Sequence, residues 1–351
     1  MLSVLSYSLL LITYVTMYTY GLKNCDDNIR KKYDYVIGFY GHCGEVTITE
    51  PDVKDTQLYK LLKTSTKQMG MDVVDCNNPD PIGLCIRQTN IKDGRRHSNS
   101  QAFLRNVDRP NLHIVTGAYV EKIRRVADLP VGENIQDHFG LNLDILLDIP
   151  TMSLYNLSQE NELLEYFFNR KGNYANVGTN LNLFLETERQ NKFNWPDIQV
   201  FINDGLLRNG ILDASKDSIM KTQEGNSAIQ DGITLTVILL HPSSRGNIKL
   251  RNKKPNLNPA IDLKLLSSKD DVKHLIKGIR KIQDFVNTPA LKAVNARIDA
   301  SFENCLSVDK DTDEYWSCVI RNYGSPYIHS GGSCRMGMNG DPNSVVDAWL
   351  R

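Results

Sequence analysis

A histidine in a glycine-rich stretch near the end of the chain is the clearest candidate for chemistry. His329 is followed by Ser330, Gly331 and Gly332 within the run Tyr327–Gly337 (YIHSGGSCRMG). A histidine side chain takes up or releases a proton near neutral pH, and glycines let the backbone approach a ligand closely. The pattern therefore indicates acid–base chemistry beside a bound molecule. The alternative is a histidine in a turn that is hydrogen-bonded to nearby backbone.

The composition is that of a globular protein with no charge bias. Hydrophobic residues make up 41% of the 351 residues and charged residues 23%, which is ordinary for such proteins. Basic and acidic residues both number 41, so the formal net charge is zero. This balance argues against a nucleic acid or an anionic membrane as the general partner.

The N-terminal stretch differs from the rest of the chain because it carries no charged side chain. Residues 1–22 are uncharged and contain an apolar run, which predicts a secretory signal peptide with cleavage between Thr16 and Cys25. The stretch is also near the roughly 20 residues that span a bilayer, so an uncleaved membrane anchor is the alternative. We therefore expect a secreted, extracellular protein.

The cysteines fit secretion, since disulfides form in oxidising compartments. All seven lie beyond the apolar run, and an odd number leaves at least one free or paired with another chain. The pairs that lie close in sequence, Cys76 with Cys85 and Cys305 with Cys318, are the first disulfides to test. No cysteine spacing resembles a zinc site, so we predict no metal.

Hydrophobic spacing predicts helices around a sheet of antiparallel strands. Helical periodicity predicts helices over 55–70, 161–170, 268–286 and 311–321. In the second of these, Leu163, Leu164, Phe167 and Phe168 form the expected apolar face. Alternation and β-branched residues predict strands over 46–49, 141–149, 181–185, 197–202 and 232–240. Together these strands indicate an antiparallel sheet with one covered face. Ser98 and Ser268 are expected N-caps of helices.

Several motifs along the chain occur in the order of one known family. They are GRRHSNSQAFL (94–104), RPNLHIVTGAYV (109–120), DLPVGENIQDH (128–138), HPSSRGNIKL (241–250) and the stretch around His329. The last resembles the signature H-x-x-G-[TS]-C-[RK]-M-G. The chain thus resembles the glucose–methanol–choline (GMC) family of flavin oxidoreductases, and within it the glucose dehydrogenase-like members of insects.

The resemblance implies an α/β (α+β) fold with two domains. Residues 33–140 and 329–351 would be remnants of a truncated, Rossmann-like FAD-binding domain, and residues 141–328 would form a substrate domain of antiparallel sheet and helices. The apolar strand that ends at Gly38 resembles a first dinucleotide-binding strand, but no G-x-G-x-x-G turn follows it. That turn normally seats the pyrophosphate on bare backbone. We therefore expect family segments to be missing after Gly38, after Ala127 and beyond Arg351, the last including a second catalytic histidine or asparagine.

The resemblance also implies a reaction. Members oxidise CH–OH groups of alcohols or sugars with FAD, and His329 would accept the hydroxyl proton while a hydride passes to the flavin. The backbone of Val120 would pair with the adenine of FAD, and His138 would be a structural histidine. The electron acceptor stays open between oxygen, quinone and dye. Loss of the pyrophosphate turn predicts weakened activity, and the alternative is a catalytically inactive secreted remnant without flavin.

Overall fold

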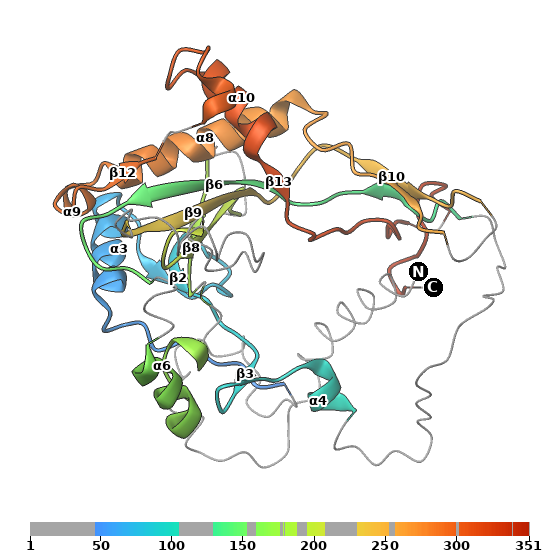
Figure 1. Ribbon diagram of the computed structural model, residues 1–351. Helices are drawn as coiled ribbons and strands as arrows, with labels where there is room; N and C mark the ends of the chain where they lie inside the picture. Colours follow the sequence, from blue (N-terminus) through green and yellow to red (C-terminus); the bar gives the residue numbers. More distant parts are fainter. Residues whose placement is uncertain are drawn as a thin grey trace.

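A sheet that is antiparallel except at one edge is the framework of the protein (Figure 1). The computed structural model describes residues 46–104, 129–152, 159–175, 178, 180–187, 195–207, 230–252, 257–299, 302–338 and 340–350. Within these ranges the strand order is β1-β2-β7-β8-β9-β6-β12, with β13 also paired to β6. Among the strands of this sheet that the structure describes, only β1 and β2 pair in parallel. The strands are β1 (Val73–Val74), β2 (Gly83–Ile86), β6 (Phe139–Leu146), β7 (Leu181–Leu185), β8 (Ile198–Asn203), β9 (Gly232–Leu239), β12 (Arg297–Ile298) and β13 (Ser325–Pro326).

The two faces of this sheet differ in chemistry because successive side chains on a strand point to opposite sides. One face is apolar and fully buried, with Leu141 and Leu143 on β6, Val237 on β9 and Val200 on β8. The register on the other face places four residues in one row across the strands, namely Asn142, Thr236, Phe201 and Asn182. The sheet therefore carries an apolar core on one side and a row containing polar groups on the other.

Helix α8 (Lys269–Val286) covers the apolar face. The Ser268 hydroxyl caps it by accepting the Asp270 backbone N–H, as expected for an N-cap. A Cβ on Gly278 would stand 3.0 Å from Ile198 of β8, so this glycine lets the helix lie close to the sheet. Figure 1 shows α8 and α10 (Asp313–Tyr323) on the same side of the sheet. Helices α3 (Gln57–Gln68) and α9 (Pro289–Lys292) pack together beside them.

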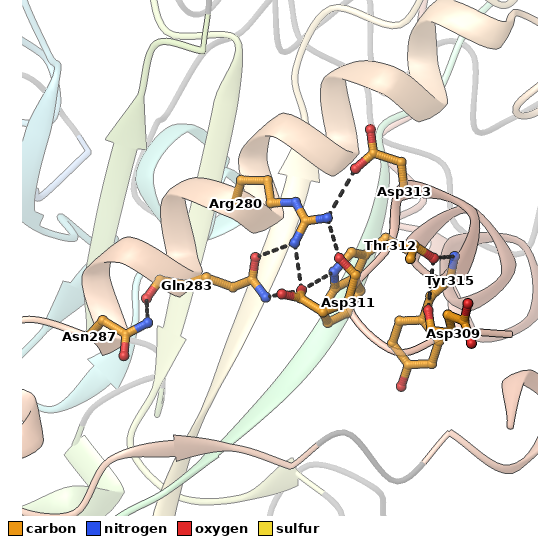
Figure 2. Close-up of polar contacts among 9 residues, drawn as sticks. Arg280, Gln283, Asn287, Asp309, Asp311, Thr312, Asp313 and Tyr315 are labelled. Atoms are coloured by element: carbon orange, nitrogen blue, oxygen red, sulfur yellow. Dashed lines mark hydrogen bonds and ion pairs between the residues drawn. The ribbon is translucent and has the colours of Figure 1, made fainter.

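A polar network joins α8 to the start of α10 (Figure 2). Arg280 of α8 donates to the Asp311 carboxylate at 2.5 Å and to Asp313 at 3.1 Å. Gln283 and Trp316 donate to the same oxygen of Asp311 at 2.6 and 3.0 Å. These donors hold the pKa of the Asp311 carboxyl below its usual value, the Gln283 bond contributing most. The network ties two helices of the covering layer together.

The smaller elements lie outside the main sheet. Strands β5 (Glu133–Ile135), β10 (Gly246–Lys249) and β11 (Ala260–Asp262) form a second sheet in the order β11-β10-β5. A hairpin of β3 (Ile91–Lys92) and β4 (Arg95–Arg96) leads into α4 (Asn99–Phe103), where Ser98 and Gln101 form a capping box. Short 3₁₀ turns occupy Asn173–Ala175 and Glu303–Cys305. The predicted N-cap at Ser98 is thus confirmed.

Both disulfides suggested by sequence proximity are present. Cys76 is bonded to Cys85, and Cys305 is bonded to Cys318. Cys334 is a free thiol. Residues 1–22, predicted to be a signal peptide, lie outside the described residues. None of the helices in the described part of the chain is long and apolar enough to cross a membrane.

Two predicted elements differ in the structure. The strand expected over 46–49 is reduced to a single bridge between Thr49 and Thr89, because Thr49 pairs with a loop residue rather than with a strand. The helix expected over 161–170 is α6 (Glu160–Leu164) followed by a π-helical turn, η1 (Glu165–Asn169). Its apolar face is exposed, with Phe168 78% accessible, so hydrophobic spacing identified the helix but not what surrounds it.

Candidate active site

The stretch around His329 lies antiparallel to the residues that lead into β6. The backbone N–H of Tyr327 donates to His138 O at 3.0 Å, and Gln136 and Gly331 exchange both backbone hydrogen bonds at 2.9 Å. Strand β13, just before Tyr327, pairs with the start of β6. The two sequence motifs that end at His138 and begin at His329 are therefore aligned side by side.

A buried carboxylate fixes the backbone at His329. Asp137 is only 3% exposed. It accepts the His329 backbone N–H at 2.8 Å and the Ser330 hydroxyl at 2.7 Å. Ile328, directly before the histidine, has a φ of +57°, which is rare for a β-branched residue. The backbone is thus held in a strained turn, and the imidazole of His329 is left exposed.

Two imidazoles meet at this turn. The Nδ1 atoms of His138 and His329 lie 3.1 Å apart, and the rings are edge to face with centroids 5.2 Å apart. Burial is the largest cause that lowers the pKa of His138, and nearby His329 and His241 lower it further. Asp137 and a backbone hydrogen bond with Leu240 act in the opposite direction. His138, expected to be only structural, is thus a direct neighbour of the candidate base.

Aromatic rings extend from the histidine pair in both directions. Tyr327 lies 6.2 Å from His329 between ring centroids and 6.4 Å from Phe201 of β8. His241 is near enough to His138 to lower its pKa. The ring centroids of His241 and Trp195 lie 6.4 Å apart. These rings form a row that includes His329, which we call the aromatic wall. Its members are Trp195, His241, His138, His329, Tyr327 and Phe201.

Polar groups of the sheet meet the aromatic wall at Asn142. Its Oδ1 accepts the Tyr327 hydroxyl at 2.9 Å and the Thr236 hydroxyl at 2.7 Å. Burial raises the pKa of the Tyr327 phenol, while its hydrogen bond with Thr236 lowers it. Tyr327 therefore stays a neutral hydrogen-bonding phenol near physiological pH. Asn142 and Thr236 are adjacent in the row across β6 and β9, so the register of the sheet places the Thr236 hydroxyl next to the Asn142 side chain.

A cation and two unpaired carbonyl oxygens lie at the far end of the wall. The Arg87 guanidinium stands 4.9 Å from the centre of the Phe201 ring, and burial lowers its pKa. The side-chain oxygens of Asn180 and Asn182 are buried, and neither has a hydrogen-bond partner among the described residues. Buried polar atoms without a partner are costly, so they are candidates for contact with water or a ligand.

Sequence reasoning found only part of this site. It identified His329, which lies at the centre, whereas Val120 lies outside the described residues. It did not select Tyr327, Phe201, Asn142 or Thr236. The strand periodicity could have found the last three, because it places them on the face of the sheet opposite the core.

Comparison with known proteins identifies the family of the chain. Two family models described as GMC oxidoreductase match residues 19–134 and 242–351. The chain belongs to the GMC oxidoreductase family. The match to the C-terminal model includes Tyr327 and His329 and begins one residue after His241, and the match to the N-terminal model ends at Asn134, just before Asp137.

Relatives of this family member include dehydrogenases from an insect and a bacterium. A "Glucose dehydrogenase [FAD, quinone]" from Drosophila melanogaster is 27% identical over 346 residues, which cover 84% of this chain and 55% of that protein. An "Alcohol dehydrogenase [acceptor]" from Pseudomonas putida is 27% identical over 386 residues, which cover 89% of this chain and 64% of that protein. The chain spans about half the length of the fly relative it matches.

Solved structures of oxidases share the fold. A pyridoxine 4-oxidase from "Mesorbium loti" superposes with a TM-score of 0.65 at 17% identity, covering 90% of this chain and 66% of that chain. A formate oxidase superposes with a TM-score of 0.68 at 16% identity, covering 90% of this chain and 68% of that chain. The mixed α/β architecture expected from the motifs is therefore confirmed.

Proposed function

We propose that this chain is an FAD-dependent oxidoreductase that acts on the CH–OH group of a small alcohol or sugar. The observation that carries the proposal is the exposed imidazole of His329 in the family signature, with its backbone N–H bonded to Asp137 and its Nδ1 next to that of His138. A base that removes a hydroxyl proton must be open to substrate and fixed in orientation. His329 meets both requirements.

The backbone beside His329 fits the ring end of FAD. Among the described residues, apart from Gly331 itself and its two neighbours in the chain, no atom lies within 4 Å of the place where a Cβ on Gly331 would stand, so a flat ring can approach the chain there. FAD, when bound, supplies the two-electron acceptor for the hydride that leaves the alcohol carbon. The adenine end would be held at Val120, which lies outside the described residues.

The residues of the site have distinct roles in this proposal. His329 takes the proton as the substrate O–H bond breaks, which raises the electron density that drives the hydride from carbon. Asp137 fixes the backbone of this base through the His329 N–H and the Ser330 hydroxyl. Tyr327, anchored on Asn142, packs next to the imidazole and limits its freedom to rotate.

The aromatic wall and the sheet's polar row support an alcohol with several polar groups, such as a sugar. Sites for small polar ligands combine apolar or aromatic walls with a few placed hydrogen-bonding groups. Phe201 and Tyr327 supply ring surface, and the unpaired oxygens of Asn180 and Asn182 are acceptors that hydroxyl groups would satisfy. Arg87 adds donors at the same end.

Secretion and the division into domains are part of the proposal. The disulfides Cys76–Cys85 and Cys305–Cys318 support an oxidising compartment, in line with a signal peptide at residues 1–22. Residues 33–140 with 329–351 would belong to the FAD-binding domain, and residues 141–328 would form the substrate domain. The aromatic wall then lies where the two domains meet.

Two measurements test the proposal: flavin binding by the full chain, and alcohol oxidation by the H329A variant. The full chain is purified after supply of FAD, and its flavin absorbance is recorded. Oxidation of a panel of alcohols and sugars is then followed with a dye as electron acceptor. Replacement H329A should lower kcat/KM by roughly 10²–10⁴-fold while flavin absorbance persists. Absence of bound flavin would overturn the proposal in favour of a flavin-free secreted protein. Unchanged oxidation by H329A would remove His329 from its role.

A further inference from the structure

A cavity lined by basic side chains lies at the hairpin of β3 and β4, and it shares no residue with the aromatic wall. Its volume is about 450 Å³, within the range of roughly 300–1,000 Å³ that is usual for small-molecule pockets. Four of its lining residues are cations, Lys92, Arg95, Arg96 and Arg170, and Asp93 is an acid. We call this the basic cavity.

Two distant parts of the chain build the basic cavity. The hairpin turn consists of Asp93 and Gly94, whose φ angles are both positive, +50° and +66°, as in the type I′ turns that join two strands tightly. A Cβ on Gly94 would stand 2.6 Å from the backbone oxygen of Arg170, so the turn and the segment after η1 are in backbone contact. Figure 1 shows α6 and β3 as neighbours. The fold thus holds Arg170 against the cations of the hairpin.

The cations of the basic cavity have no counter-charge in the described part of the chain. Lys92 and Arg95 are directly opposite each other across the hairpin, and like charges in that position repel. Within the described residues, no ion pair involves either of them, Arg96 or Arg170. Four cations against the carboxylate of Asp93 leave an excess of three positive charges. An anionic ligand would offset this repulsion.

Two further side chains that line the basic cavity, His97 and Gln101, also present hydrogen-bond donors. Nδ1 of His97 accepts the Thr47 backbone N–H at 3.2 Å, so the proton of this ring is at Nε2. Oε1 of Gln101 accepts the Ser98 backbone N–H at 3.1 Å, which leaves the amide NH₂ group as the donor. Donors therefore predominate among the polar groups of the lining, which suits a ligand rich in acceptor oxygens.

We propose that the basic cavity binds a small molecule that carries two linked phosphate groups. A single phosphate group brings about −1.5 to −2 charges near pH 7, less than the excess of three positive charges, whereas two linked groups come close to it. Arginine binds phosphate oxygens through two parallel hydrogen bonds, and Arg95, Arg96 and Arg170 line one hollow. This site goes beyond the proposed function and does not depend on it.

Calorimetry with inorganic pyrophosphate tests the site. The full chain is titrated with pyrophosphate, inorganic phosphate and sodium chloride at equal ionic strength. We expect pyrophosphate to bind about tenfold or more tighter than phosphate, because it also engages the cations that one phosphate group leaves unpaired. The double variant R95Q/R170Q should raise the Kd for pyrophosphate by about 100-fold. R321Q, on the exposed side of α10, is the matched control and should keep the wild-type Kd. Equal affinity for the two anions, or an unchanged Kd in the double variant, overturns the proposal.

Thermal unfolding separates a ligand site from a structural cluster. Because Lys92 and Arg95 repel each other across the hairpin, R95Q should melt at the wild-type temperature or slightly above it when no anion is added. Saturating pyrophosphate should raise the melting temperature of the wild type, since it binds the folded chain, and should raise that of R95Q much less. If R95Q melts lower without an anion and responds to pyrophosphate as the wild type does, Arg95 stabilises the fold and the site is refuted.

Two nucleotides identify the source of the linked phosphates. ADP and FAD are each added to the complex with pyrophosphate, and displacement is measured by calorimetry. Displacement by FAD would assign the basic cavity to the flavin, whose usual G-x-G-x-x-G turn does not follow Gly38. Displacement by ADP alone would assign it to a separate nucleotide, and displacement by neither to pyrophosphate itself. A chain that binds pyrophosphate in the basic cavity but no flavin would keep this site and lose the proposed function.

Discussion

Asp137 and His329, which are 192 positions apart in the sequence, are joined by a 2.8 Å hydrogen bond from the His329 backbone N–H to the buried carboxylate. The Ser330 hydroxyl donates to the other oxygen of the same carboxylate. Asp137, directly before His138, is thus hydrogen-bonded to both His329 and Ser330. This link explains why the two stretches of sequence form one site.

Removal of this carboxylate should weaken both the fold and the site. In D137A the His329 N–H and the Ser330 hydroxyl lose their acceptor in a buried place, which costs about 1–3 kcal/mol of unfolding free energy. D137N keeps one carbonyl oxygen and should lose less. Urea unfolding measures the difference, with D80A on an exposed turn as the control. A D137A protein as stable as D80A would contradict this account of the turn.

The pKa of His138 predicts a pH dependence of stability. Its folded pKa lies below the unfolded value of 6.5, mainly through burial, so the unfolded chain binds more protons between the two values. Stability therefore rises with pH across this window and is reduced below it. H138N lacks this contribution. The unfolding free energy of wild type minus that of H138N should increase from about pH 5 to about pH 8. A flat or falling difference would show that the ring is not desolvated.

The network between α8 and α10 gives a test remote from the site (Figure 2). Arg280 bonds both Asp311 and Asp313, but Asp311 is largely exposed, so the pair is screened by solvent. A double-mutant cycle with R280M and D311N should give a coupling of about 0.5–1 kcal/mol. Because the pKa of Asp311 is depressed, the coupling is present above its unfolded value of 3.8 and is lost as the pH falls through the lower folded value. No coupling at pH 7 would show that the helices are held by their apolar contacts alone.

Local pattern predicted the elements of this fold better than their surroundings. The strand Leu181–Leu185 and the helix after Ser268 were predicted within one residue, because alternation and helical spacing are properties of a short stretch of chain. The exposed Phe167 and Phe168 show the limit. Hydrophobic spacing states that a helix has an apolar face, but which element covers that face depends on distant residues.

In the site, too, residues in a contiguous motif could be predicted, whereas contacts between distant parts of the chain could not. His329 could be found because its motif is contiguous in sequence. Its partner His138 is 191 residues away, and nothing in the local pattern indicates that the two Nδ1 atoms meet. Asn142 and Thr236 come together only through the register between β6 and β9. Pairing register depends on the whole sheet, so these contacts needed the structure.

The phenol of Tyr327 offers a third test near the imidazole. In Y327F the Asn142 oxygen loses one donor but keeps the Thr236 hydroxyl, so the loss of unfolding free energy should be small, about 0.5–1.5 kcal/mol. T236V removes the other donor and is the matched comparison. The double variant leaves the Asn142 oxygen without either donor and should lose more than the sum of the two single variants. Thermal unfolding measures all three, and strict additivity would contradict a shared acceptor.

The backbone before His329 stores strain that a substitution should release. Ile328 has a φ of +57° and its side chain is 77% exposed, so this left-handed conformation brings it little burial in return. Asparagine adopts that conformation more readily than a β-branched residue. I328N should therefore raise the unfolding free energy by about 1 kcal/mol. V131N replaces another exposed apolar residue, one without a positive φ, and should leave stability nearly unchanged. If both variants shift the melting temperature equally, the gain comes from removing exposed apolar surface, and the turn before His329 is not strained.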